Sequence, residues 1–569
     1  MKKSNSYLTG LISRMTLEQK IGALLTLGFA GTVPGRNIYE YVEKYHCGGL
    51  RLSCDARIFG NYVDPNGEKT VVKVESNAGV KHRGAPPYPT VSEYKAVLDD
   101  LQRVARNRPL SLPLHFSFDQ EGGTSADFAF GGVNLFPKPM GLRATDEPEM
   151  SYRVALAVSK QCRAVGFHWV HSPVLDVNCD PRNPEIYTRA YSDDANEVTK
   201  YALESCKGFK EGGLIATGKH FPGRGDSDVD AHFKVPVIDV DRETMINREL
   251  LPYRRLIEAD VLPSIMLAHS FFPAFDSEHI ATVSKKVITG LLREEMGYEG
   301  VITTDSMTMG AIATKYGVAN ACALSLEAGA DLVLMKAENQ LVPETIAAIR
   351  EFVETGRISM EELDTKVYRV LNVKYNYGLF HPGPAENPET VMADPEIKAL
   401  AAQVARRSVL IGRDNGTLPL KKDANILVVE QRVKNYNSFT WHSGILAEAC
   451  ARIGGNVTYL ETEYTYDESD KARFEAFAEC ADIIVATNYY IRGKLCNKAF
   501  LEDFIPRCGK PVVVVTNTPY EALSIPKNAA SVVVTLATSP ENIKVTAGTL
   551  FGTVQPEGVW PVSVKLEGI

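Results

Sequence analysis

The sequence predicts an α/β protein with two domains, an N-terminal (β/α)8 barrel of the TIM type followed by a C-terminal three-layer α/β sandwich domain. Eight short apolar runs, separated by stretches long enough for amphipathic helices, occur before residue 336. A proline-rich, acidic segment follows them. Beyond that segment, nearly continuous β-branched runs alternate with polar helical stretches, which is typical of a parallel sheet covered on both faces.

The apolar runs of the first domain are expected to form its barrel strands. In chain order they span residues 24–29, 48–52, 114–118, 168–175, 213–217, 264–267, 300–304 and 331–335. Polar or ionisable side chains lie at or just beyond the ends of the later runs, namely Asp119, Asp176, Lys219, His220, His269, Asp305 and Lys336. Because the C-terminal ends of barrel strands converge on one face, we expect these side chains to become neighbours in a single site.

Composition marks the boundaries of the domains. The barrel with its helices is assigned to residues 1–380, including an insertion at 54–96, the linker to 381–398, and the sandwich domain to 399–569. The predicted strands of the second domain are the runs at 408–412, 425–430, 482–487, 511–517 and 530–536. The Gly454-Gly455 pair lacks the spacing of a dinucleotide-binding loop, so we expect no nucleotide there.

The overall composition narrows the class of partner. The 569 residues are 44% apolar and 23% charged, with a formal net charge of −8, whereas a nucleic-acid or anionic-membrane surface favours a basic face. The ten cysteines form no CxxC pair, which disfavours a zinc ribbon and a disulfide framework. Neither a signal-peptide pattern nor a membrane-length apolar run is present. We expect a cytoplasmic enzyme that acts on a small molecule, without nucleic acid or membrane as partner, and we leave a homodimer open.

The densest group of functional side chains lies at residues 219–232, which read Lys-His-Phe-Pro-Gly-Arg-Gly-Asp-Ser-Asp-Val-Asp-Ala-His. Charged side chains and histidines on a glycine-containing loop bury little apolar surface, so the segment suits a ligand better than packing. Asp230 and His232 are one residue apart, so in an extended loop both side chains point to the same side and can hydrogen-bond. Such a pair suits a general acid/base. Asp305, at a predicted strand end, can serve as the nucleophile of a two-step covalent displacement.

Two other interpretations of this loop stay open. Asp226, Asp228, Asp230 and His232 can supply metal ligands, although the spacing lacks the glycine and the distal glutamate of a calcium loop, and no HExxH motif suits zinc. The other interpretation is a purely structural loop. Because a carboxylate and an imidazole suffice for the chemistry above, we expect neither a metal nor an organic cofactor.

Motifs along nearly the whole chain match a known family. They are LISRMTLEQKIG near the start, FDQEGG at 118–123, NPEIYTRAYSDD at 183–194, KHFPGRGDSDVDAH at 219–232, MLAHSFFPAFD and ITTDSMTMGAI. On these residues the chain resembles glycoside hydrolase family 3, in particular its NagZ-like β-N-acetylglucosaminidase branch. Each motif alone is moderately specific, and together they are highly specific.

The resemblance implies a retaining exo-glycosidase that releases a β-linked sugar from a non-reducing end. It makes Asp305 the nucleophile that forms a glycosyl-aspartate, and it makes His232, oriented by Asp230, the acid/base in place of a second carboxylate. The favoured reaction is release of β-linked N-acetylglucosamine from small saccharides or cell-wall fragments.

The resemblance also implies which residues bind the sugar. Asp119, Arg189, Lys219 and His220 are expected to hold its hydroxyls in the −1 subsite, where charged donors and acceptors penalise the wrong sugar by leaving a group unpaired. His269 is expected to line the same pocket, with a buried structural histidine as the alternative.

The chain departs from the family pattern at three places. After DQEGG it continues with Thr124, Ser125 and Ala126 where arginine and valine are usual, so one substrate or packing contact is missing. Arg224 stands where histidine is common and places a permanent charge beside the loop, so it joins the substrate-binding candidates. The insertion is either a solvated loop or a lid over the pocket; its basic residues are Lys69, Lys73, Lys81, His82 and Arg83.

Other functions remain open on the sequence. A histidine acid/base repels phosphate less than a carboxylate would, and Arg224 attracts it, so the enzyme is alternatively a β-N-acetylglucosaminide or β-glucoside phosphorylase. Thr124 and Arg224 also fit a β-glycosidase for a different sugar, such as glucose or an acidic sugar. From another class, a non-catalytic sugar-binding protein would keep the pocket without turning over substrate.

Overall fold

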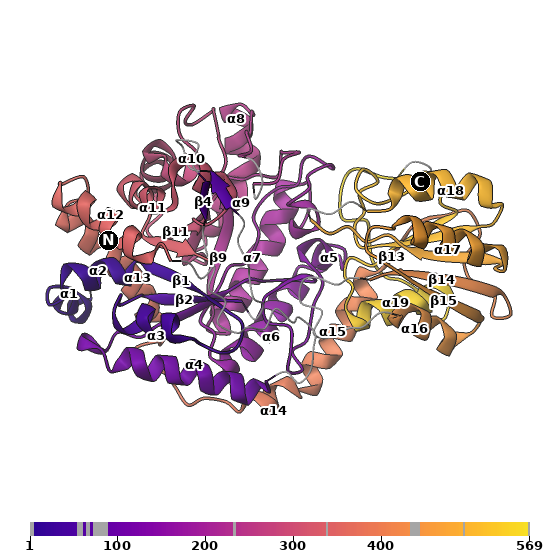
Figure 1. Cartoon of the computed structure of the whole chain (residues 1–569), viewed down its shortest axis with the longest axis horizontal. Helices are drawn as coiled ribbons and strands as arrows, with labels where there is room; N and C mark the ends of the chain where they lie inside the picture. Colours follow the sequence, from indigo (N-terminus) through magenta and orange to yellow (C-terminus); the bar gives the residue numbers. More distant parts are fainter. Residues whose placement is uncertain are drawn as a thin grey trace.

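The computed structural model describes residues 5–53, 61–63, 69–71, 89–231, 235–336, 340–432, 444–492 and 496–566. The two domains lie side by side along the long axis of the molecule, with the barrel on the left of Figure 1 and the C-terminal domain on the right. Within the described ranges, no helix has the length and apolarity that a membrane crossing requires.

Eight parallel strands close into a barrel in the order β1-β12-β11-β10-β9-β8-β5-β2. Their bounds are β1 Leu25–Ala30, β2 Gly49–Ser53, β5 His115–Phe118, β8 Trp169–Val170, β9 Ile215–Phe221, β10 Ser264–Leu267, β11 Val301–Ser306 and β12 Leu332–Met335. Each strand overlaps one of the predicted apolar runs, so the predicted barrel is confirmed, although β8 is shorter than its run and β9 continues beyond its run to Phe221. Two short hairpins lie outside the barrel sheet, β3 Asn61–Val63 with β4 Lys69–Val71 and β6 Gln120–Gly122 with β7 Ser125–Ala126.

Helices surround the barrel and cover the outer face of its strands (Figure 1). All six residues of β1 are buried, because one face of the strand meets the barrel interior and the other meets helices, and the predicted runs are continuously apolar for the same reason. Thr16, Thr90 and Ser359 start their helices with capping boxes that satisfy free backbone N–H groups. The helices of this domain are α1 Ser6–Ile12, α2 Leu17–Ala23, α3 Arg36–Glu43, α4 Val91–Arg106, α5 Pro139–Arg143, α6 Glu149–Val165, α7 Ala195–Glu211, α8 Arg242–Thr244, α9 Leu251–Glu258, α10 Gly310–Tyr316, α11 Val318–Ala328, α12 Val342–Glu354 and α13 Met360–Asn376, with wider π-type turns at Met245–Glu249 and Lys286–Glu295.

The C-terminal domain is built on a six-stranded sheet in the order β13-β18-β17-β16-β14-β15. β13 runs antiparallel to β18, so the sheet is mixed, whereas a parallel sheet was predicted. The prediction was wrong about direction because a β-branched run has the same sequence pattern in a parallel and in an antiparallel strand. Antiparallel edge strands on otherwise parallel sheets are common. The prediction also missed β15, an edge strand whose residues are mostly not buried. The bounds are β13 Leu410–Asp414, β14 Asn425–Gln431, β15 Asn456–Thr462, β16 Ile483–Thr487, β17 Val512–Thr516 and β18 Ser531–Val534.

Helices cover both faces of this sheet, which confirms the three-layer prediction. Along β14, Leu427 and Val429 face the core shared with α17 and α18, whereas Ile426 and Val428 face the core shared with α16 and α19, because successive strand residues point to opposite faces. The remaining helices are α14 Pro388–Met392, inside the predicted linker, α15 Pro395–Ser408, α16 Ile445–Ile453, α17 Glu468–Glu479, α18 Lys498–Cys508 and α19 Pro540–Leu550.

The two domains meet along the barrel segment that follows β8. The Asn178 side-chain amide donates a hydrogen bond to the Tyr520 hydroxyl at 2.8 Å. The Tyr490 hydroxyl donates to the Pro184 carbonyl at 2.9 Å. Tyr187, although part of the barrel, lies within the apolar core of the C-terminal domain. These contacts fix the C-terminal domain beside the end of the barrel where the strands terminate.

Candidate active site

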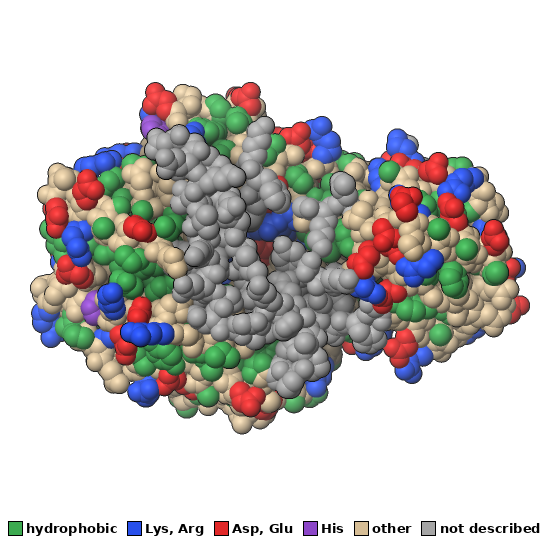
Figure 2. All heavy atoms as spheres, in the orientation of Figure 1, with side chains coloured by type: hydrophobic (Ala, Val, Ile, Leu, Met, Phe, Trp, Pro, Cys, Tyr) green, Lys and Arg blue, Asp and Glu red, His purple; other side chains and the backbone are tan. Residues whose placement is uncertain are grey.

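A pocket opens at the C-terminal ends of the barrel strands, beside the C-terminal domain. Figure 2 shows basic side chains, with acidic ones near them, at the floor of a hollow in the middle of this face. Most of the lining side chains are ionisable, and the C-terminal domain contributes one of these, Arg492, together with the apolar Ile491. The acidic and basic ones are Arg51, Asp119, Glu121, Asp127, His171, Glu185, Arg189, Lys219, His220, Arg224, Asp305, Lys336 and Arg492.

Asp119, directly after β5, is bound by three cations. The Lys219 ammonium lies 2.8 Å from Oδ1 and the Lys336 ammonium 2.6 Å from Oδ2. The Arg51 guanidinium also contacts Oδ2. Burial alone would raise the pKa of Asp119, but the cations outweigh it and hold the pKa well below its ordinary value. Asp119 is therefore an ionised, rigidly held acceptor, and closure of the barrel is what brings the distant Lys336 to it.

Glu121 forms a second buried ion cluster next to Asp119. Arg189 donates from Nε to Oε2 at 2.8 Å and from Nη2 to Oε1 at 2.9 Å, and Lys219 Nζ lies 2.5 Å from Oε1. Burial alone would raise the pKa of Glu121, but Arg189 and Lys219 bring it to about 2. Two predicted sugar-binding side chains, Arg189 and Lys219, are thus oriented by a carboxylate that was not among the predicted site residues, although it lies within the FDQEGG motif.

His220 lies at an irregularity of β9 and is oriented by Asp176. Lys219 and Phe221 pair with Met266 and Leu267, which are consecutive residues of β10. His220 is therefore an extra residue in β9, and such a bulge redirects its side chain. Its Nδ1 lies 2.7 Å from Asp176 Oδ2, and Arg189 Nη2 approaches its Nε2 at 3.4 Å. Burial, with the nearby cations, lowers the pKa of His220 well below its ordinary value. The ring is therefore neutral, donates from Nδ1 to Asp176 and keeps Nε2 as an acceptor.

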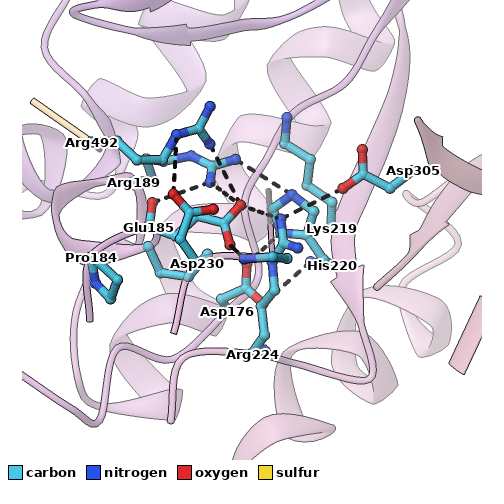
Figure 3. A network of polar contacts seen from close by, with 12 residues as sticks. Asp176, Pro184, Glu185, Arg189, Lys219, His220, Arg224, Asp230, Asp305 and Arg492 are labelled. Atoms are coloured by element: carbon cyan, nitrogen blue, oxygen red, sulfur yellow. Dashed lines mark hydrogen bonds and ion pairs between the residues drawn. The ribbon is translucent and has the colours of Figure 1, made fainter. Parts of the chain in front are cut away.

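Asp305 lies in the pocket wall at a second strand irregularity. Between Thr303 and Ser306, β11 has one residue more than β12 opposite it, and such a bulge re-aims the side chains within it. The Asp305 Oδ1 accepts a hydrogen bond from the Ser306 amide at 2.7 Å, and Arg224 Nη2 lies 3.6 Å from Oδ2. Figure 3 shows the carboxylate facing the Lys219 and Arg224 side of the network. A partly exposed carboxylate in this position can reach a ligand in the pocket.

The loop after β9 is anchored up to the residue before the predicted acid/base. Asn183 Nδ2 donates to the carbonyls of Arg224 and Gly225, both at 3.1 Å. A Cβ at Gly225 would lie 1.6 Å from the Val177 carbonyl, so the approach requires glycine. The Ala231 amide donates to Glu185 Oε2 at 3.1 Å. His232 itself lies outside the described residues, and its role stays a prediction.

Glu185 connects this loop to three arginines, as Figure 3 shows. Its Oε1 lies 3.0 Å from Arg224 Nη2, 3.5 Å from Arg492 Nη1 and 3.8 Å from Arg189 Nη1. Arg492 Nε also lies 3.8 Å from Asp230 Oδ2. Neither Glu185 nor Arg492 was among the site residues predicted from the sequence. Glu185 lies within the NPEIYTRAYSDD motif, which was one available signal, but Arg492 belongs to the other domain and carries no motif.

One predicted pocket residue is placed differently. His269 is fully buried and is not a lining residue, because its Nδ1 pairs with the Thr282 hydroxyl at 2.7 Å and its Nε2 with the Ser306 carbonyl at 3.0 Å. It supports the strand that carries Asp305, which corrects the expectation that it lines the pocket. Thr124, one of the departures from the family pattern, does line the pocket.

The predicted insertion at 54–96 falls largely outside the described residues, including Lys73, Lys81, His82 and Arg83. Its last residues are the beginning of a barrel helix, α4, which starts at Val91. The insertion therefore ends earlier than the sequence suggested.

The chemistry of the pocket suits a polyhydroxylated ligand. Among the lining residues, six cations and five carboxylates alternate, so donors and acceptors face the same space. Each of these carboxylates forms an ion pair with a lysine or an arginine. Such carboxylates do not suit a metal ion, which needs carboxylate oxygens as its own ligands. Asp226, one of the alternative metal ligands, pairs with Arg248 at 2.6 Å. In the described part of the chain, the one group of metal-type ligands that comes together is Asp276, Glu278 and His279, which does not line the pocket.

Comparisons with known proteins identify a family and several relatives. The family described as "Glycosyl hydrolase family 3 N terminal domain" matches residues 16–373. The Beta-hexosaminidase A of Pseudoalteromonas piscicida is 28% identical over 443 residues, which cover 74% of this chain and 71% of that protein. The Beta-N-acetylglucosaminidase/beta-glucosidase of Cellulomonas fimi is 30% identical over 366 residues, 61% of this chain and 62% of that protein.

A solved structure is similar along the whole chain. It is a glycoside hydrolase family 3 β-N-acetylglucosaminidase from Paenibacillus sp. str. FPU-7, with a TM-score of 0.85 and 27% sequence identity. The match covers 97% of this chain and 99% of that chain. The likeness therefore includes both domains and not the barrel alone.

Proposed function

Because this chain belongs to glycosyl hydrolase family 3 and is a glycoside hydrolase, we propose that it is a retaining exo-β-glycosidase that releases β-linked N-acetylglucosamine from small saccharides or cell-wall fragments. The observation that carries the proposal is Asp305 in the wall of a pocket whose other charged side chains suit sugar hydroxyls. The names of the relatives, β-hexosaminidase and β-N-acetylglucosaminidase, support the choice of sugar.

The proposed reaction has two steps. A carboxylate oxygen of Asp305 attacks the anomeric carbon while the bond to the leaving oxygen breaks, and the protonated His232 gives its proton to that oxygen. This step forms a glycosyl-aspartate and frees the aglycone. The neutral His232 then takes a proton from water, whose oxygen attacks the anomeric carbon and releases Asp305. Asp230 orients the imidazole in both steps.

The sugar-binding part of the proposal rests on groups that are fixed before substrate arrives. Asp119 and Glu121 are ionised acceptors held by cations, and the neutral His220 ring, held between Asp176 and Arg189, lines the same pocket. Because the two carboxylates are already oriented, binding a hydroxyl to them requires little reorganisation. A sugar that lacks a matching hydroxyl leaves a buried group unpaired, which gives the site its selectivity.

A panel of nitrophenyl β-glycosides tests the proposal. We expect the N-acetylglucosaminide to be cleaved faster than the glucoside and the glucuronide, and Asp305→Ala to remove the activity. Mass spectrometry after reaction with a fluorinated β-glycosyl donor, which slows the second step, is expected to find the sugar on the peptide that contains Asp305. Indifference to the 2-acetamido group would exclude the proposed sugar, and a labelled peptide without Asp305 would exclude the mechanism.

Phosphorolysis is a second candidate function, favoured by one observation on Arg224. Its side chain is 2% exposed, and its Nε and Nη1 have no hydrogen-bond partner among the described residues. A buried guanidinium with free donors beside the nucleophile attracts an anion such as phosphate. Phosphate should then accelerate turnover and yield a sugar 1-phosphate, and Arg224→His should weaken that response. No acceleration by phosphate would exclude this candidate and leave hydrolysis.

A further inference from the structure

Arg492 extends the pocket with a charge that the C-terminal domain supplies. It closes the segment 488–492, which follows β16. The backbone N–H groups of Tyr489, Tyr490 and Ile491 are each held by a side chain of the same domain, at 2.6 to 2.8 Å. Because the backbone of these three successive residues is fixed in this way, the C-terminal domain determines the position of the Arg492 backbone.

The same segment is attached directly to the barrel. The Tyr490 hydroxyl donates to the Pro184 carbonyl at 2.9 Å, and its ring packs edge-on against Tyr187, with centroids 5.0 Å apart and planes at 78°. Pro184 and Tyr187 flank Glu185 in the chain. The contact that joins the domains therefore also sets the distance between Arg492 and Glu185.

The Arg492 guanidinium reaches two carboxylates of the barrel, as Figure 3 shows. Its Nη1 lies 3.5 Å from Glu185 Oε1 and its Nε lies 3.8 Å from Asp230 Oδ2. The other oxygen of Glu185 accepts the Ala231 amide at 3.1 Å. One guanidinium thus contacts the side chain of residue 230 and the carboxylate that binds the backbone of residue 231, immediately before His232.

Burial of Glu185 and Asp230 strengthens their electrostatic interaction with Arg492. The Glu185 side chain is 2% exposed and that of Asp230 is 7% exposed, so the two negative charges are poorly screened by water. Without a cation between them they would repel, and the loop could relieve the repulsion by moving away. Arg189 and Arg224 also pair with Glu185. Arg492, whose side chain is 30% exposed, is the arginine of the C-terminal domain that contacts both carboxylates.

We propose that Arg492 is a positioning residue for the acid/base, through which the C-terminal domain takes part in the reaction. By neutralising Glu185 and Asp230 together, it holds the loop so that Asp230 can orient the imidazole that follows. This inference rests on the function proposed above, in which His232 protonates the leaving oxygen. It predicts a defect in leaving-group protonation and not in sugar binding.

Kinetics of the full-length protein on two substrates test the inference. One is a dinitrophenyl β-N-acetylglucosaminide, whose leaving group needs no proton, and the other is an N-acetylglucosamine disaccharide, whose leaving group does. For Arg492→Gln we expect the rate constant of the glycosylation step, from single-turnover experiments, to fall about 100-fold on the disaccharide and less than about tenfold on the dinitrophenyl substrate, with KM changed less than about threefold. Arg492→Lys keeps the charge without the fork of donors, so it should recover part of the loss.

Three matched variants separate charge from stability. Arg473→Gln removes an arginine whose ion pair with Asp470 lies within α17, and it should behave as wild type. Tyr490→Phe removes the hydrogen bond to Pro184 without removing a charge, and it should give a smaller selective loss than Arg492→Gln. If Arg492→Gln does not fold, Arg492→Lys carries the test.

The outcomes are distinct. A larger loss on the disaccharide than on the dinitrophenyl substrate supports the inference. Equal losses on the two substrates, or no loss, overturn it while leaving the proposed function intact. A wild-type protein that cleaves neither substrate overturns the proposed function, and the inference with it.

Discussion

Replacing Glu121 with glutamine is expected to lower the free energy of unfolding by about 3 kcal/mol at neutral pH. Burial alone would raise the pKa of Glu121, but Arg189 and Lys219 bring it from the ordinary 4.5 to about 2. At about 1.4 kcal/mol per pKa unit, this difference corresponds to about 3 kcal/mol. Breaking a buried ion pair by removing one partner costs about 3–5 kcal/mol, because the remaining charge is uncompensated, so the two routes agree.

The effect should depend on pH in a defined direction. Because the pKa of Glu121 is lower in the folded protein, its stabilisation is present above about pH 4.5 and is lost as the pH falls through about 2. Urea unfolding of wild type and Glu121→Gln, followed by fluorescence, should therefore show the full difference at pH 7 and a shrinking difference in acid.

A surface pair of the same geometry provides the control. Arg357 donates to both oxygens of Glu327 at 2.8 and 2.6 Å, but this pair is exposed, and exposed pairs contribute about 0–1 kcal/mol. Glu327→Gln should accordingly change the unfolding free energy little. If Glu121→Gln were no more destabilising at pH 7 than Glu327→Gln, the reasoning from burial would be wrong.

Two further predictions concern groups behind the pocket. Asp176→Asn removes the carboxylate that accepts from His220 Nδ1, so kcat/KM on nitrophenyl substrates should fall about 100-fold; unchanged kinetics would contradict the assigned orientation of His220. Burial raises the pKa of Glu249 to about 7. Between about pH 4.5 and about pH 7 the carboxyl group therefore ionises only in the unfolded chain, so the free energy of unfolding of the wild type should fall as the pH rises through this range. Glu249→Gln should flatten this dependence in urea unfolding, and an unaltered slope would refute it.

The barrel was predictable because its strands are buried on both faces. A run such as 331–335 is then apolar at every position, and its length and spacing from the next run indicate a strand. In the C-terminal domain, continuous apolar runs likewise predicted the central strands, but they do not indicate whether β13 runs parallel or antiparallel to its neighbour. It also missed β15, since an edge strand buries too little of its surface to need an apolar sequence.

The candidate site was predictable where a side chain lies at a strand end. Asp119, Lys219 and Asp305 were expected at the pocket for this reason, because the barrel alone determines where strand ends meet. Arg492 could not be found in this way. It lies 307 residues from Glu185 in the chain, in another domain, and a contact at that distance leaves no periodicity or spacing in the sequence. His269 shows the opposite limit, since a histidine just beyond a strand end can be fully buried and pair with Thr282 and with Ser306 of β11 instead of lining the pocket.

The position of Tyr187 has a consequence for protein engineering. Its ring belongs to the barrel yet packs, with Met140 and Ala144, among the apolar side chains of the other domain. A truncated barrel would present these three side chains to water, and a chimera that borrows its second half from a relative would need to accommodate them. The two halves of the molecule are therefore not interchangeable modules, and directed evolution of substrate preference should vary them together.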